Sequence, residues 1–151
     1  MDYKVLLEQA KSILKESGKD KEQKLLGVCQ LLFDSIPYYD WVGFYFADHD
    51  RRVLELGPYV GDETDHVIIP FGKGICGQVA NSNETFLVDD VTAQDNYIAC
   101  SITVKSEIVV PLFVKGVNIG QIDIDSHTKA AFTAEDQEFL ENLNLEVANI
   151  F

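Results

Sequence analysis

Apolar residues near the start of the chain recur at intervals of three and four, which is the period of an amphipathic helix. The first stripe consists of Tyr3, Leu6, Leu7, Ala10, Ile13 and Leu14. Gly18 follows as a typical C-terminal stop. A second stripe consists of Leu25, Cys29, Leu32 and Phe33. It predicts a helix that starts near Lys21 and ends before Pro37, with Cys29 in the core.

From Trp41 onward the pattern changes to that of β-strands. Two β-rich runs, 41–46 and 52–57, flank the polar residues 48–51 and predict a hairpin. A second hairpin joins the apolar run 107–114 to 117–126 across Lys115 and Gly116. Shorter runs at 66–70 and 84–90 predict two more strands, and the glycine-rich segment 72–80 between them predicts a short helix.

The last segment of the chain predicts a closing helix. Thr133 and Asp136 have the spacing of a capping box, with aspartate in place of the usual Glu or Gln. The apolar stripe that follows is Phe139, Leu140, Leu143, Val147 and Ile150. The order of elements is therefore α-α-β-β-β-α-β-(loop)-β-β-α. It predicts one α+β domain over residues 1–151, with an antiparallel sheet and helices packed against one face.

The charge of the chain excludes some partners. Of 151 residues, 12 are basic and 25 acidic, and half of the basic residues lie within the first 24 positions. Nucleic acids and anionic membranes are therefore not expected as partners, whereas a small zwitterion or cation is compatible with this charge. The N-terminus lacks the apolar run of a signal peptide, and no stretch is apolar enough to span a membrane, so we expect a cytoplasmic protein with reduced cysteines.

The three cysteines match neither a CxxC redox motif nor a zinc pattern. Cys76 comes just after the predicted start of the short helix, where the helix N-terminus favours a thiolate; a buried structural cysteine is the alternative. Cys100 lies in a polar connection, the kind of segment that often carries catalytic residues, and from spacing alone it is as compatible with an inert thiol as with a reactive one.

Three acidic residues surround the second predicted hairpin. Asp123 and Asp125 are two apart in one strand and share a face with Gln121, while Glu107 begins the partner strand. Clustered carboxylates raise one another's pKa and can supply a proton donor near neutral pH. One alternative is an ordinary solvated sheet face. Another is a divalent metal site, which the lack of a nearby histidine at ligand spacing makes less favoured.

Aromatic side chains dominate the first predicted strand, at Trp41, Phe44 and Tyr45. Such residues most often belong to the core. A cage around a small cation or a methyl group is the functional alternative.

Together these motifs resemble the GAF-domain family, and specifically its branch of free methionine-(R)-sulfoxide reductases. The resemblance runs from about Trp41 to the end and rests on WVGFY, LGPYVG, IPFGKGICG, DDV, YIAC, SEIVVPL and IDIDS. It implies a GAF-like antiparallel sheet and an enzyme that reduces free L-methionine (R)-S-oxide to methionine. We expect no metal and no cofactor. Similar proteins often form homodimers, so the resemblance also implies a homodimer.

The resemblance assigns catalytic roles to two cysteines. Cys100 would attack the sulfoxide sulfur and become a sulfenic acid as methionine leaves, and Cys76 would resolve it to a disulfide. Thioredoxin or a similar dithiol reductant would restore the thiols.

The resemblance also assigns substrate-binding residues. Glu107, Asp123 and Asp125 would bind the amino group and the sulfoxide oxygen of free methionine sulfoxide and donate a proton. Trp41 and Tyr45 would wall the pocket around the substrate methyl group.

The chain departs from the family pattern at His66, where members with three active-site cysteines carry one of them. The motif around Cys100 also differs, with Ser101 where aspartate is usual and Tyr97 before Ile98 where histidine is common. We expect a two-cysteine variant, with His66 either solvated in its loop or placed to bind substrate or tune a thiol. The alternative function is a non-catalytic GAF sensor module that binds a small molecule, but such a module would not need both Cys76 and Cys100.

Overall fold

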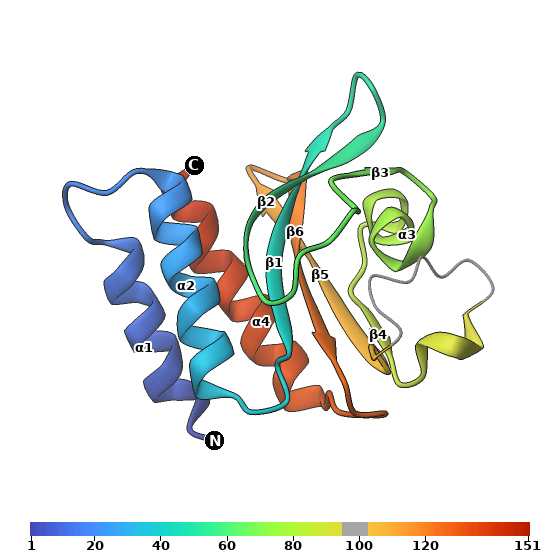
Figure 1. The fold of residues 1–151 in the computed structure, drawn as a ribbon. Helices are drawn as coiled ribbons and strands as arrows, with labels where there is room; N and C mark the ends of the chain where they lie inside the picture. Colours follow the sequence, from blue (N-terminus) through green and yellow to red (C-terminus); the bar gives the residue numbers. More distant parts are fainter. Residues whose placement is uncertain (95–102) are drawn as a thin grey trace.

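The computed structural model describes residues 1–94 and 103–151. Within these residues one antiparallel sheet forms the centre of the molecule (Figure 1). Its strands run in the order β3-β2-β1-β6-β5-β4. Their bounds are β1 (Trp41–Asp48), β2 (Val53–Val60), β3 (Ile68–Pro70), β4 (Phe86–Val88), β5 (Ser106–Val114) and β6 (Val117–Ser126). All pairings between neighbouring strands are antiparallel, as predicted.

The helices begin and end close to the predicted positions. They are α1 (Tyr3–Leu14), α2 (Lys21–Ser35), α3 (Gly74–Ser82) and α4 (Ala134–Val147), with short 3-10 turns at Val91–Ala93 and Ala148–Ile150. Asp20 accepts a hydrogen bond from the Gln23 backbone N–H while the Gln23 side chain accepts from that of Asp20, which closes a capping box at the start of α2. In the described parts of the chain, no helix has the length and apolarity needed to cross a membrane.

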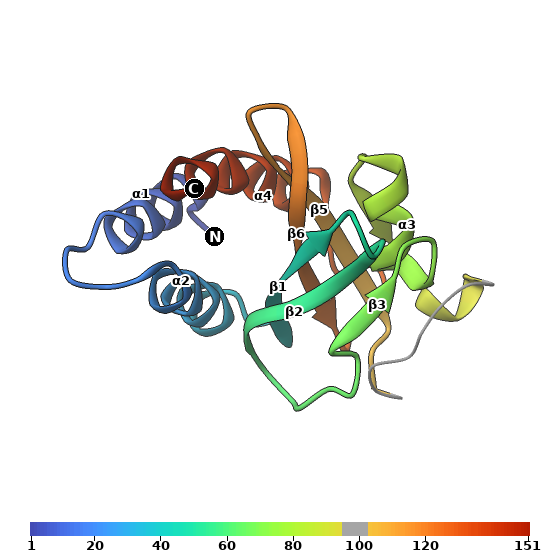
Figure 2. The same ribbon diagram turned by 90° about the horizontal axis from the view of Figure 1, so that it is seen from above.

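Both faces of the sheet are covered. Helices α1, α2 and α4 lie on one face and enclose the larger apolar core, which includes Cys29 as predicted (Figure 2). Helix α3 lies on the opposite face, over β5 and β6, with a smaller apolar cluster beneath it. The expected α+β class with an antiparallel sheet is confirmed. The expectation that the helices pack against one face is wrong for α3, which forms a second layer on the other face and covers the region of the candidate site.

The two predicted hairpins form with the expected partners. The turn between β5 and β6 consists of Lys115 and Gly116, whose φ angles of 52° and 79° both lie in the left-handed region. A two-residue turn of this kind matches the twist of the flanking strands. It sets the register next to the turn, and a bulge between Leu112 and Phe113 then shifts the pairing by one residue, so that Glu107 faces Asp125.

Asp136 ties the helical layer together. Its Oδ1 accepts hydrogen bonds from the hydroxyl groups of Tyr3, Tyr38 and Tyr39 at 2.8 to 2.9 Å. Its Oδ2 accepts from the backbone N–H of Thr133 at 2.8 Å, as expected of a capping residue. This buried carboxylate therefore joins α1, the segment before β1 and α4 through charge-assisted hydrogen bonds.

Candidate active site

Strands β1, β6 and β5 form the floor of the candidate site. Their register places Trp41, Asp125 and Glu107 in one row across the sheet. The neighbouring row contains Gly43, Asp123 and Val109. Because alternate residues of a strand share a face, all three carboxyl groups lie on the face covered by α3. The sequence predicted this grouping.

The three carboxyl groups are buried. Glu107 is 4% exposed, and Asp123 and Asp125 are 1% exposed. The alternative of a solvated sheet face is therefore wrong, because α3 packs over β5 and β6. Both carboxylate oxygens of Asp125 and Oδ1 of Asp123 have no hydrogen-bond partner in the described structure. Buried polar atoms without partners are costly and point to a role other than stability.

Burial raises the pKa of both aspartates. The pKa of Asp125 lies well above its ordinary value because of desolvation, and the neighbouring charge of Asp123 raises it further. For Asp123, desolvation also raises the pKa, while hydrogen bonding to Glu107 and Cys76 and the charge of His66 oppose the rise. The two groups thus differ in environment, and Asp125 is the stronger candidate for a neutral proton donor.

Cys76 lies in the first turn of α3 and faces the carboxyl groups. Its thiol donates a hydrogen bond to Glu107 Oε2 at 3.9 Å, and Gln121 Nε2 donates to its backbone oxygen at 3.2 Å. Desolvation, followed by the charges of the three carboxyl groups, raises the pKa of Cys76 well above the ordinary value. The expectation that the helix N-terminus would favour a thiolate here is wrong, because burial beside acids outweighs the helix field.

Cys100, the expected nucleophile, lies within 95–102 and so falls outside the described residues, as do Tyr97 and Ser101.

The aromatic residues of β1 divide between the two faces. Phe44 belongs to the larger core, while Trp41 and Tyr45 lie on the face of the site. The indole of Trp41 stacks on Tyr59, with ring centroids 5.3 Å apart, and its Nε1 donates to the backbone oxygen of Asp62 at 3.0 Å. The loop before β3 therefore holds the Trp41 ring in place.

Two small cavities border these side chains. One, of about 20 Å³, is lined by residues that include Trp41 and Asp125. The other, of about 10 Å³, is lined by residues that include Tyr45, Cys76 and Asp123. Each is about large enough for one water molecule. Substrate binding at these positions requires the surrounding side chains to move apart.

His66 lines the smaller cavity together with Cys76, Glu107 and Asp123. Its side chain is half-buried. This position fits the alternative that placed His66 near substrate or a thiol, and its role stays a prediction. The sequence offered one signal for this, namely that His66 occupies the position of a family cysteine.

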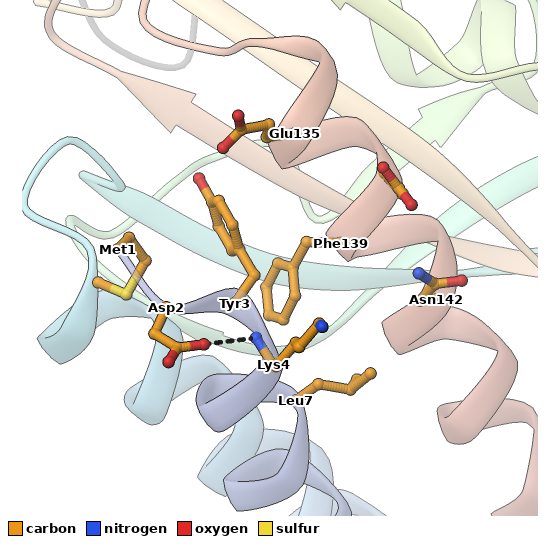
Figure 3. A pocket seen from close by; sticks show the side chains of 9 residues that line it. Met1, Asp2, Tyr3, Lys4, Leu7, Glu135, Phe139 and Asn142 are labelled. Atoms are coloured by element: carbon orange, nitrogen blue, oxygen red, sulfur yellow. Dashed lines mark hydrogen bonds between the residues drawn. The ribbon is translucent and has the colours of Figure 1, made fainter.

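A far larger hollow, of about 650 Å³, lies on the opposite face of the sheet between the N-terminal ends of α1 and α4 (Figure 3). Tyr3, Leu7 and Phe139 form its apolar part, and Asp2, Glu135 and Glu138 contribute acidic groups. No thiol or imidazole is among the described residues that line it. Its chemistry therefore does not match the redox motifs, which meet under α3.

Cys76, Glu107 and Asp123 place a sulfur and carboxylate oxygens within 4.8 Å of one another, a separation that metal ligands also have. A metal ion would have to displace the thiol proton, because a cysteine ligand binds as thiolate. The expectation of a site without metal stays a prediction.

Gly43 provides the space that the Trp41 ring occupies. A Cβ at this position would lie 2.4 Å from Cη2 of Trp41 and 2.7 Å from Cβ of Tyr59. We expect Gly43→Ala to displace the indole and to raise the KM for substrate about tenfold or more. Steady-state kinetics with the substrate that the resemblance implies would measure this. Gly18→Ala lies far from the site, where a Cβ meets nothing within 4 Å; its φ of 78° makes the change cost some stability, but KM should be unchanged. An unchanged KM in Gly43→Ala would show that the ring position is unimportant.

Comparison with known proteins extends the resemblance to nearly the whole chain. Residues 25–151 match the GAF domain family. The free methionine-R-sulfoxide reductase of Escherichia coli (strain K12) is 37% identical over 126 residues, which is 83% of this chain and 74% of that protein.

Solved structures agree with this match. The structure of free methionine-R-sulfoxide reductase from Neisseria meningitidis in complex with its substrate is 37% identical, with a TM-score of 0.92 over 99% of this chain and 87% of that chain. A type II free methionine-R-sulfoxide reductase from Thermoplasma acidophilum is 39% identical, with a TM-score of 0.80 over 96% of this chain and 94% of that chain. The chain therefore belongs to the GAF domain family, in the branch of the free methionine-(R)-sulfoxide reductases.

Proposed function

We propose that this protein reduces free L-methionine (R)-S-oxide to methionine by thiol chemistry. The observation that carries the proposal is the cluster of three buried carboxyl groups around the thiol of Cys76. A structural role does not explain it, because several of these polar atoms have no hydrogen-bond partner in the described structure. Membership of the reductase branch supplies the reaction that such a cluster can serve.

The reaction begins at Cys100. Its sulfur attacks the sulfoxide sulfur while the sulfoxide oxygen takes up a proton. The resulting hydroxyl group then moves from the substrate sulfur to the Cys100 sulfur as the bond between the two sulfur atoms breaks, which releases methionine and leaves Cys100 as a sulfenic acid. Asp125 is the proposed proton donor, because burial and the charge of Asp123 keep its pKa well above the ordinary value. The Cys76 thiol then attacks the sulfenic sulfur of Cys100, which forms a disulfide and releases water. The carboxyl groups that surround Cys76 relay its proton to the departing hydroxyl group, which leaves as water.

The substrate is held by charge and by aromatic surface. Its ammonium group fits the acidic cluster, and its methyl group fits against Trp41 and Tyr45, which line the adjoining cavities. The site lies beneath α3 and the loop before β3, so a free amino acid can enter where a methionine within a polypeptide cannot.

Two cysteines suffice for this cycle. His66 takes the place of the third family cysteine, so Cys76 resolves Cys100 directly. Thioredoxin or a similar dithiol in the cytoplasm then reduces the disulfide, with two thiols oxidised for each disulfide reduced. We further propose that residues 1–151 act as a single GAF domain, and that two copies can associate as a homodimer.

The test uses purified protein with thioredoxin, its reductase and NADPH. We expect methionine release and NADPH consumption with the free (R) epimer, and no release above background with the (S) epimer or with an N-acetylated, peptide-bound (R)-sulfoxide. Release from the peptide would contradict the enclosed site. Failure to turn over any sulfoxide, combined with saturable binding of methionine sulfoxide in calorimetry, would instead support the non-catalytic sensor module.

A further inference from the structure

The backbone of His66 is fixed against the site from two sides. Its oxygen accepts a hydrogen bond from the Tyr45 hydroxyl at 2.9 Å. Its N–H donates to Thr64 Oγ1 at 3.1 Å. Tyr45 is fully buried in β1, so this anchor ties the loop to the sheet. The half-buried imidazole is thereby held at the cavity that it shares with Asp123.

The groups that face Asp123 are mostly acidic. They are Cys76 from α3, Glu107 from β5 and Asp125 from its own strand, while Tyr45 of β1 lines the same cavity. Basic side chains on the cavity lining come from His66 and from Lys73, which is exposed at the start of α3.

His66 shares a cavity with only one of the two aspartates among the described residues. It lines the cavity that Asp123 lines, whereas Asp125 lines the cavity beside Trp41. Burial raises the pKa of Asp123, and the charge of His66 is one of the influences that oppose this rise. When the environments of two neighbouring carboxyl groups separate their pKa values, one group can act as a carboxylate and the other as an acid.

We propose that His66 is a positioning residue of the site: its imidazole lines the cavity that Asp123 lines and favours Asp123 as the carboxylate that receives the substrate's ammonium group, which leaves Asp125, on the neighbouring cavity, as the acid that protonates the sulfoxide oxygen. This rests on the proposed function. His66 acts through Asp123 and needs no contact with the substrate. Without its charge, Asp123 and Asp125 compete for the same proton, and the ammonium group loses its dedicated partner.

The first measurement follows the carboxyl groups in the substrate-free protein. Carbon-13 NMR of aspartate-labelled protein, with Asp123 assigned by Asp123→Asn, gives its titration midpoint. We expect His66→Gln to move this midpoint upward by about one pH unit and His66→Lys to restore it, because lysine carries a charge that glutamine lacks. His49→Gln is the control, since His49 lies at the β1–β2 turn and contacts Asn118 instead. An unchanged midpoint in His66→Gln overturns the proposal, and it does so whether or not the protein turns over.

The second measurement separates binding from chemistry. We expect His66→Gln to raise the KM for the free (R) epimer about tenfold with little change in kcat, and to shift the acid limb of kcat/KM to higher pH. His66→Lys should recover both. A shifted NMR midpoint with an unchanged KM would contradict the assignment of the ammonium group to Asp123. A wild-type protein without turnover would contradict the proposed function. The NMR titration midpoint of Asp123 would still show whether His66 acts on Asp123.

Discussion

Replacing Cys100 by serine is expected to abolish methionine release, with a loss of at least about 10³-fold in kcat. A serine hydroxyl is a far weaker nucleophile toward sulfur and cannot form a sulfenic acid or a disulfide. Release of methionine from the free (R) epimer in the presence of thioredoxin measures the effect.

Two other cysteine variants serve as comparisons. Cys29→Ala should retain activity, because Cys29 is buried among apolar side chains of the helical layer. Cys76→Ser should release about one methionine per protein without reductant and leave a sulfenic acid that dimedone labels at Cys100. Full activity in Cys100→Ser would show that another group is the nucleophile, and a dimedone label elsewhere would identify it.

Asp125→Asn is expected to change activity and stability in opposite directions. The amide keeps the size of the side chain but cannot transfer a proton, so kcat should fall by about 10²- to 10⁴-fold. The same change removes a buried acid whose charged form is disfavoured by desolvation and by the charge of Asp123, whereas the unfolded chain leaves that acid free to ionise. The free energy of unfolding should therefore rise by about 1–3 kcal/mol at neutral pH.

The stability gain depends on pH in a defined direction. Because the folded protein raises the pKa of Asp125 well above 3.8, the native state binds this proton more tightly than the unfolded chain does. Wild-type stability from this group is thus highest at acid pH and is lost as pH rises through the raised pKa. We expect the advantage of Asp125→Asn to be larger at pH 8 than at pH 5, as measured by urea unfolding.

Asp136→Asn is the matched control on the other face of the sheet. Both residues are buried aspartates, but Asp136 accepts hydrogen bonds from three tyrosine hydroxyls and from a backbone N–H. This variant should lose about 2–4 kcal/mol of stability while the folded fraction retains its kcat. If Asp125→Asn were destabilised in the same way with its kcat unchanged, Asp125 would be a structural residue.

The sequence predicted the parts of the fold that depend on local pattern. The stripes of α1, α2 and α4 and the Lys115–Gly116 turn identify elements over a few residues each, and the register of a two-residue hairpin follows from its turn. The pairing of Glu107 with Asp125 also needs a bulge between Leu112 and Phe113, which shifts the register by one residue. The sequence therefore predicted that the carboxyl groups share one hairpin, but not the register that brings them together.

The burial and charge state of the site could not be predicted in this way. Alternation in a strand shows which residues share a face, but not whether that face is covered. Asp123 and Asp125 are buried because α3 packs over β5 and β6, which the alternation does not show. The thiolate expectation for Cys76 considered only its own helix, whereas the dominant charges come from β5 and β6. The tyrosine contacts of Asp136 join residues about 100 or more positions apart, beyond any local pattern.

Trp41 is the only tryptophan in the chain, and it lies in the candidate site. All intrinsic indole fluorescence of this protein therefore originates beside Asp125, from a ring stacked on Tyr59 and hydrogen-bonded to the Asp62 carbonyl. Movement of the loop before β3 exposes that ring to water and shifts its emission to longer wavelength. The protein thus carries its own optical reporter of site opening, which can be followed in stopped flow without any label.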